Sequence, residues 1–288
     1  MKTLIFGSAG QLGNALLEAA PSDAEVVAVT RQDGDLSIAG VAGDIISKNC
    51  PTLILNAAAY KSVDGAELNH AHARALNELA PAEMAQAASQ TGARFIHVST
   101  DFVFDGAARK PYQPEDQTSP LGMYGQTKRD GEQAVLRADP TAMIVRVGWL
   151  YGADGQNFVK SMLRLAEKQD TLAVVSDQIG TPTSARSTAV ALWALAQTDV
   201  FGLMHYSDRG EASWYDFAVA IFEEAVTVGL LDQAPTVRPI ASIDYPTAAK
   251  RPPYSVLDPT ASAAILGSSP QHWRTHLRKV IEELKHRG

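Results

Sequence analysis

Cysteine is almost absent from this 288-residue chain, which contains one, Cys50. A single thiol forms no intrachain disulfide and builds no metal site alone, so its scarcity fits a reducing compartment. Cys50 stands before Pro51 at the entry to an apolar run, and we expect it to be a buried packing residue. The seven histidines show no metal-site spacing, since His70 and His72 would point to different faces of a helix. We therefore predict no metal site.

Long apolar runs and clusters of positive charge are also missing. No stretch approaches the ~20 apolar residues that cross a bilayer, and the N-terminal MKTLIFGSAG lacks the apolar region and cleavage site of a secretory signal. The formal net charge is -7 and the basic residues are scattered, whereas nucleic-acid binding needs clustered cations. We expect a cytoplasmic protein that binds neither membranes nor nucleic acid. A few local charges or a helix N-terminus can still bind a small anion.

Short apolar runs alternate with helical patterns through the first half of the chain. Strands are predicted at 3–6, 26–30, 53–56, 95–99 and 143–147, with helices at about 11–20, 41–48, 68–91 and 124–138. Strands separated by helix-length segments indicate crossover units and a parallel sheet. Continuous apolar runs such as LIFG and LILN suit strands buried on both faces. We predict an α/β fold with a doubly wound parallel sheet of the Rossmann type.

The second half is less regular and predicts a smaller, interleaved C-terminal lobe. The patterns indicate a strand at 172–175, a loop at 177–184, helices at 187–197, about 214–228 and 271–286, and a strand at 202–206. We expect residues 1–150 to form a dinucleotide-binding domain and 151–288 mainly a substrate-binding lobe. Segments near 185–206 would return to the first domain.

A glycine-rich turn follows the first predicted strand directly and opens the first helix. Gly7, Gly10 and Gly13 have the spacing G-x-x-G-x-x-G, with Gln11 and Leu12 between the last two. Small residues let the backbone approach a pyrophosphate, and the helix N-terminus then offers it free N–H groups. The position between strand and helix favours dinucleotide binding over an ordinary glycine turn.

The second predicted strand ends in Thr30 and Arg31, where an acid usually receives the adenosine ribose of NAD(H). A guanidinium could instead bind the 2′-phosphate of NADP(H), so we predict NADPH as the preferred cofactor, with NADH also usable. Asp35 and Leu36 follow and could line the adenine pocket. The alternatives stay open: Arg31 could be a solvated loop residue, and Asp33 or Asp35 could supply the ribose contact.

Two further segments end predicted strands at the same edge of the sheet. Ala57, Ala58 and Ala59 leave room for a flat ligand, although tight helix packing would explain them too. Trp149 could stack on a sugar or a base, or pack in the core. Arg146 lies within a predicted strand and needs a partner if it is buried.

Thr100, Tyr124 and Lys128 form the most informative set. Thr100 follows the fourth predicted strand, and Tyr124 and Lys128 are four residues apart on one helix face. Reduction of a ketone needs a hydride and a proton, and a tyrosine hydroxyl can donate that proton if its anion is stabilised. We expect the nearby ammonium group of Lys128 to lower the pKa of Tyr124 from its ordinary value near 10. Thr100 would hydrogen-bond the same carbonyl oxygen.

These segments together resemble the extended short-chain dehydrogenases/reductases, and within them the dTDP-4-dehydrorhamnose reductases. The matching segments are GSAGQLG (7–13), NAAAYKSVDGAE (56–67), STDFVFDG (99–106), YGQTK (124–128), RVGWLYG (146–152), DQIGTPTS (177–184), GLMHYS (202–207) and RPPYSVLD (251–258). They run in family order across nearly the whole chain. The resemblance implies reduction of the C4 ketone of dTDP-4-dehydro-β-L-rhamnose to dTDP-L-rhamnose with NADPH or NADH.

The resemblance also implies roles for individual residues. Thr100, Tyr124 and Lys128 match the catalytic triad of the family, and Thr100, Asp101 and Trp149 match substrate-contacting positions. The cofactor-contacting positions are Gly10, Gln11, Leu12, Asp35, Leu36, Ala59, Tyr60 and Lys61. Lys61 departs from the family, in which a small hydroxylated residue is common, and could add a contact to nicotinamide or phosphate.

Two alternative functions stay open. One is reduction of another nucleotide-linked 4-keto-6-deoxyhexose, because the triad does not select the sugar. The other is a non-catalytic regulatory subunit like that of methionine adenosyltransferase, against which the intact triad argues, since fold alone would not decide. We expect a small-molecule nucleotide sugar as partner and leave a homodimer open.

Overall fold

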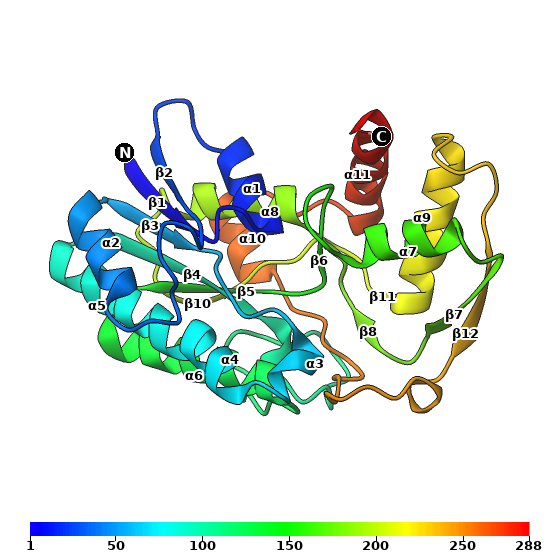
Figure 1. Cartoon of the computed structure of the whole chain (residues 1–288), viewed down its shortest axis with the longest axis horizontal. Coiled ribbons are helices and arrows are strands. Elements are labelled where there is room, and N and C mark those ends of the chain that lie inside the picture. The colour runs from blue at the N-terminus through cyan, green and yellow to red at the C-terminus, as the bar shows by residue number, and fades with distance from the viewer. Residues whose placement is uncertain (288) are drawn as a thin grey trace.

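A six-stranded parallel sheet forms the centre of the computed structural model, which describes residues 1–287 (Figure 1). The strands are β1 (Lys2–Phe6), β2 (Glu25–Val29), β3 (Leu53–Asn56), β4 (Arg94–Thr100), β5 (Met143–Val147) and β10 (Gly202–His205). Their order is β10-β5-β4-β3-β1-β2, and all neighbouring pairs are parallel. The chain leaves β1 for β2 on one side and returns to β3 on the other. The carboxyl ends of β1 and β3 therefore flank the switch point at which doubly wound sheets bind ligands.

Helices cover both faces of this sheet, which confirms the predicted fold class (Figure 1). One face carries α1 (Gln11–Glu18), α8 (Ala185–Leu195) and α10 (Thr260–Leu266), and the other carries α2 (Val41–Asn49), α5 (Ala80–Thr91) and α6 (Met123–Ala138). In β1, Ile5 packs on the α1–α8 side, whereas Leu4 and Phe6 pack on the opposite side, and all three are fully buried. Burial on both faces explains why this strand has a continuous apolar sequence.

A smaller lobe with its own hydrophobic core lies beside the sheet (Figure 1). It contains α7 (Phe158–Ala166), α9 (Trp214–Thr227), α11 (Trp273–Arg287) and the parallel pair β7 (Thr171–Val175) and β12 (Thr236–Ile240). Phe217, Ile221 and Leu277 are fully buried at its centre. Along the chain, α8 and β10 interrupt this lobe and join the layers of the sheet. Across residues 1–287, no helix has the length and apolar character of a membrane span.

Residues 177–184 are not the simple loop that we predicted. They contain β8 (Ile179–Gly180), which pairs with β11 (Ala212–Ser213), and β9 (Thr183–Ser184), which pairs with β6 (Leu150–Tyr151). Strands of two residues are too short to show an alternating pattern in the sequence. Their partners lie far away along the chain, so only the folded lobe reveals them.

The helix predicted at 68–91 is confirmed over residues 70–91, but five of its residues form a π-helical turn. After the short α3 (Val63–Ala66), the chain forms α4 (His70–Arg74), a π-helical turn (Ala75–Leu79) and then α5. Pro81 accounts for the change in hydrogen bonding, because proline has no N–H to donate to the carbonyl group four residues earlier. That carbonyl belongs to Asn77, which lies inside the π-helical turn.

Cys50 is exposed, so its predicted burial was wrong. It ends α2 in the left-handed region, with φ 47°, where the chain reverses toward β3. Its thiol contacts the Ser47 carbonyl oxygen at 3.2 Å. A helix-ending position of this kind faces solvent because the last turn must let the chain leave the helix.

Candidate active site

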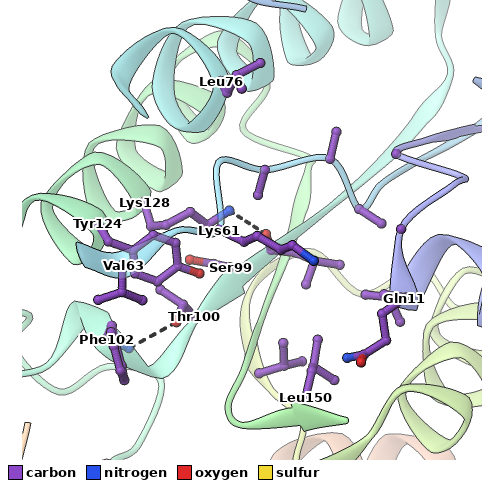
Figure 2. A pocket seen from close by; sticks show the side chains of 18 of the residues that line it. Gln11, Lys61, Val63, Leu76, Ser99, Thr100, Phe102, Tyr124, Lys128 and Leu150 are labelled. Atoms are coloured by element: carbon purple, nitrogen blue, oxygen red, sulfur yellow. Dashed lines mark hydrogen bonds between the residues drawn. The ribbon is translucent and has the colours of Figure 1, made fainter. Parts of the chain in front are cut away.

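A cleft of ≈ 770 Å³ runs along the carboxyl edge of the sheet, between the sheet and the second lobe. Most of the predicted site residues line it: Gly7, Gly10, Gln11, Leu12, Arg31, Asp35, Leu36, Ala59, Lys61, Thr100, Asp101, Tyr124, Lys128 and Trp149. In Figure 2, Thr100, Tyr124 and Lys128 lie together at one end of the cleft and Gln11 lies at the other.

Gly13 and Tyr60 are predicted site residues that do not form part of the cleft wall. Gly13 supports the turn from behind, since a Cβ there would lie 2.2 Å from the Gly7 carbonyl oxygen. The Tyr60 ring turns to His72, with ring centroids 5.6 Å apart. Its backbone N–H donates to the Asn77 side chain at 2.8 Å, which holds the Ala59–Lys61 segment in place.

The glycine turn brings the chain backbone close to the cleft. Gly7 has φ +75°, and a Cβ there would lie 2.6 Å from the Ala58 amide nitrogen, so only glycine fits. Gly10 is the N-cap of α1, and no side chain caps the first turn. The N–H groups at the start of α1 therefore remain free for an anion, as a dinucleotide pyrophosphate requires. Side-chain volume that would block such a ligand is absent from this turn.

The segment after β2 has an exposed arginine and no free acid at the strand end. Asp33 accepts hydrogen bonds from the Thr30 backbone N–H at 2.8 Å and from the Thr30 hydroxyl at 2.7 Å. The Arg31 side chain is 75% exposed and pairs with Asp35 at 3.1 Å. Hydrogen bonds from Ser37, with a smaller contribution from Arg31, lower the pKa of Asp35 to about 2. Arg31 therefore has a partner in its own loop that a phosphate group would have to displace or share.

Close packing brings Tyr124 to Thr100 at the opposite end. Thr100 ends β4 and caps a short 3₁₀ turn (Asp101–Val103) by accepting a hydrogen bond from the Phe102 N–H at 3.2 Å. Gly125 allows α6 to pack directly on this turn, because a Cβ there would lie 2.1 Å from the Phe102 carbonyl oxygen. The Tyr124 and Phe102 rings meet edge to face, with centroids 5.8 Å apart.

The pKa of Tyr124 moves in the direction opposite to our prediction. Burial raises it to about 12, Asp101 adds to the rise, and the Thr100 hydroxyl opposes it. Lys128 does not lower it, because its Nζ donates to the Val98 carbonyl oxygen at 2.8 Å and lies 3.3 Å from His97 Nε2. The lysine thus directs its amino group to the sheet, and burial lowers its own pKa to about 8.

Asp101 links the cleft to the last part of the chain. One carboxylate oxygen accepts a hydrogen bond from the Ser255 hydroxyl at 2.6 Å and the other accepts one from the Thr100 hydroxyl at 3.1 Å. The side chain is buried, and burial raises its pKa to about 6. Ser255 lies in the RPPYSVLD segment, so the second lobe helps to orient Thr100 through Asp101.

Trp149 forms the wall of the cleft where the two lobes meet. Its ring stacks on that of Trp214, the first residue of α9, with centroids 3.5 Å apart and an interplanar angle of 4°. Trp149 has φ 48°, and the neighbouring Gly180 leaves room for its ring, since a Cβ there would lie 2.4 Å from Trp149. Trp149 packs against the lobe core, as one of the two alternatives predicted, and it also lines the cleft. Its stacking on a sugar or a base stays a prediction.

Three residues of the site region were not singled out from the sequence: His97, Trp214 and Ser255. Ser255 belongs to a segment that the family resemblance includes, which is the one signal that could have indicated it. His97 reads as one more residue of a buried strand, and Trp214 as a helix residue after its N-cap Ser213. In the folded chain Trp214 lines the cleft, while His97 and Ser255 lie behind its wall against Lys128 and Asp101.

A doubly wound sheet with a glycine turn after β1, together with Thr100, Tyr124 and Lys128 after β4, defines the extended short-chain dehydrogenases/reductases. Within that class, a more specific assignment follows from comparison with known proteins. The chain belongs to the family described as RmlD substrate binding domain, whose model matches residues 1–286.

Named relatives and solved structures support the same membership. A dTDP-4-dehydrorhamnose reductase of Aggregatibacter actinomycetemcomitans is 40% identical over 287 residues, covering 97% of this chain and 98% of the relative. A crystal structure of a dTDP-4-dehydrorhamnose reductase from Clostridium acetobutylicum has TM-score 0.93 and 36% identity, covering 99% of this chain and 100% of that one. The Bacillus anthracis reductase, solved in complex with NADP, has TM-score 0.92 and 31% identity, covering 98% and 99%.

Proposed function

We propose that this chain reduces the C4 ketone of dTDP-4-dehydro-β-L-rhamnose to dTDP-L-rhamnose, with NADPH as the preferred cofactor. One observation carries the proposal: a single cleft contains both the glycine turn, which a pyrophosphate can approach, and the side chains of Thr100, Tyr124 and Lys128. The names of the relatives, which are dTDP-4-dehydrorhamnose reductases, support the choice of substrate. Bacillus anthracis reductase with bound NADP supports the choice of cofactor.

The residues present fit a dinucleotide along the cleft. Gly7, Gly10 and the N-terminus of α1 would hold the pyrophosphate, and Gln11 and Leu12 would flank it. Arg31, Asp35 and Leu36 would surround the adenosine, while Ala59 and Lys61 would lie nearer the nicotinamide. When bound, NADPH supplies the hydride for C4 of the sugar.

The catalytic end of the cleft then donates one proton to the substrate and stabilises the charges that form during its transfer. Tyr124 donates its hydroxyl proton to the developing alkoxide oxygen, and its raised pKa keeps that proton available across the physiological pH range. Thr100 exchanges its bond to Asp101 for one to the same oxygen. Lys128 in its charged form stabilises the tyrosinate that remains. Asp101 and Trp149 would contact the sugar, with most other sugar contacts supplied by residues 151–288.

Absorbance at the reduced-nicotinamide band tests this function directly. The purified protein is mixed with NADPH and dTDP-4-dehydro-β-L-rhamnose, and the product is identified by mass spectrometry and NMR. We expect NADPH consumption matched one to one by dTDP-L-rhamnose. No consumption with this substrate, but rapid consumption with another nucleotide-linked 4-keto-6-deoxyhexose, would reassign the substrate. Tight NADPH binding without turnover of any keto sugar would support the regulatory-subunit alternative instead.

A cytoplasmic location and a homodimer remain predictions. The low cysteine content and the reducing cofactor support the cytoplasm. Cell fractionation tests the location, and size-exclusion chromatography with light scattering tests the oligomeric state.

A further inference from the structure

Asn56, His97 and Lys128 form a buried row of hydrogen-bonding side chains behind the catalytic end of the cleft. Asn56 Nδ2 lies 3.0 Å from His97 Nδ1, and His97 Nε2 lies 3.3 Å from Lys128 Nζ. The exposed fractions of the three residues are 1%, 0% and 2%. Neither Asn56 nor His97 lines the cleft, so neither can touch the substrate or the cofactor directly.

The direction of every hydrogen bond in this row follows from one backbone group. The Ala58 N–H lies 3.0 Å from Asn56 Oδ1 and can only donate, so the atom facing it must be the amide oxygen. The NH₂ group of Asn56 then faces His97 and donates to Nδ1. Burial and the nearby Lys128 hold the pKa of His97 well below its usual range, so the ring is neutral. A neutral imidazole that accepts at Nδ1 carries its proton on Nε2.

This tautomer directs an N–H at Lys128. A lysine ammonium group has three N–H donors and no acceptor, so the charged side chain would set donor against donor at 3.3 Å. A neutral amine has a lone pair, which can accept from His97 Nε2–H while an N–H of the amine donates to the Val98 carbonyl oxygen. The sheet-facing position of Lys128 therefore suits the neutral amine and opposes the ammonium.

We propose that His97 is a positioning residue that lets Lys128 lie against the sheet only as the neutral amine, so that charged Lys128 turns its ammonium into the cleft, toward Tyr124. The inference rests on the proposed reductase function, in which that ammonium supports Tyr124. It gives the row a role in the reaction, because the charge of Lys128 is placed where the tyrosinate forms.

The other ionisable groups around Lys128 do not provide an alternative anchor at the sheet. They are Tyr124 and Glu132 on α6, Asp101 after β4, Arg146 on β5 and Lys61 on the cleft wall. Glu132 favours the charged lysine, but its carboxylate is already held by Arg146 through two hydrogen bonds of 2.8 and 2.7 Å. Asp101 and Tyr124 lie on the cleft side and would receive the ammonium after it has turned.

The tautomer of His97 can be observed without any enzyme activity. Protein labelled with ¹⁵N-histidine, free of cofactor and substrate, is studied by two-bond ¹H–¹⁵N correlation between pH 6 and 9.5, and His97 is assigned by its loss in His97→Asn. We expect a neutral Nε2–H ring whose Nε2 shift moves once, as Lys128 titrates, and stays constant in Lys128→Met. A ring protonated on Nδ1, or an imidazolium, overturns the proposal even if the protein proves to be an active reductase.

The pH profile of kcat/KM distinguishes positioning from a purely structural role. His97→Asn keeps an oxygen where Nδ1 stands, so Asn56 retains its acceptor, but it removes the donor that faces Lys128. The alkaline limb should move upward by about one pH unit, because the charged lysine is no longer opposed. His97→Gln, whose Oε1 can accept from the ammonium, should move it in the same direction.

A matched control is available in another buried histidine. His205 on β10 is 1% exposed; its Nδ1 lies 2.9 Å from the Tyr112 carbonyl oxygen and its Nε2 lies 3.4 Å from the Arg146 guanidinium, so neither ring nitrogen contacts Lys128. His205→Asn should leave the alkaline limb in place. A slower His97→Asn enzyme with an unmoved limb would show that His97 only fills space. If no keto sugar is turned over, the proposed function fails while the histidine titration still decides the inference.

Discussion

The two ends of the cleft differ in how far their polar and charged groups are exposed to solvent. At the catalytic end Thr100 is 6% exposed and Lys128 is 2% exposed, and their few hydrogen bonds set which groups carry protons. At the adenosine end the Arg31 side chain is 75% exposed and its charge is shared with Asp35. Solvent screens the exposed pair and leaves the buried groups unscreened. The comparison predicts large, pH-dependent effects of substitution at one end and small, pH-independent effects at the other.

Tyr124→Phe should have the largest effect. The change removes the proton donor alone, and loss of general acid catalysis costs ~10²–10⁴-fold in kcat. Cofactor affinity, measured by fluorescence of bound NADPH, should change little. Tyr112→Phe is the control, because Tyr112 is buried and lies outside the cleft wall. Near-normal turnover in Tyr124→Phe would remove this residue from the proposed mechanism.

Lys128 should give the strongest dependence on pH. Its pKa is lowered to about 8, so the ammonium is present below that pH and is lost as the pH rises through it. We expect kcat/KM of the native protein to fall above about pH 8. Lys128→Arg keeps its charge at every accessible pH, so the fall should disappear at the cost of a lower rate. Lys128→Met should lose ~10²-fold or more below about pH 8, and its deficit should shrink at higher pH as the native lysine loses its charge. An alkaline limb that persists in both variants would have to come from another group.

Arg31→Ala should have a modest effect on cofactor choice. A charged hydrogen bond contributes ~1.5–3 kcal/mol when it is protected, but exposure and the competing Asp35 reduce this to ~1 kcal/mol. The preference for NADPH over NADH should therefore fall about fivefold, mainly through a higher KM for NADPH. Side-by-side kinetics with both cofactors make the measurement. A ratio unaffected by the substitution would make Arg31 a surface residue and the enzyme one of dual specificity.

Asp35→Asn should have the smallest effect and the opposite sign. Removing the carboxylate frees Arg31 from its 3.1 Å ion pair, so preference for NADPH should rise by about twofold. Because the pKa of Asp35 is about 2 and a phosphate monoester is fully ionised well above its second pKa of about 6, the difference from the native protein should be constant between about pH 7.5 and 9. A pH-dependent difference would contradict the contrast drawn between the two ends of the cleft.

Sequence patterns predicted well the features that depend on residues close together in the chain. β3 and β5 have the predicted bounds, because a buried parallel strand is a short apolar run. The glycine turn lies where the spacing of Gly7, Gly10 and Gly13 placed it, since a Cβ at Gly10 or Gly13 would crowd the Gly7 carbonyl oxygen of the same turn. The predictions differed from the structure where a distant segment determines the local structure, as for the paired strands within 177–184. They also differed where Pro81 changes the hydrogen bonding within a helix.

The sequence by itself determined the fold class and brought Thr100, Tyr124 and Lys128 to one edge of the sheet, because strand ends and helix periodicity carry that information. Only the tertiary structure decided how those groups are charged. The raised pKa of Tyr124 comes from burial, and the sheet-facing position of Lys128 comes from Val98 and His97 on β4. The spacing of Tyr124 and Lys128 predicts neither the raised pKa nor the sheet-facing position, since burial and hydrogen-bond direction depend on the segments that pack around these residues.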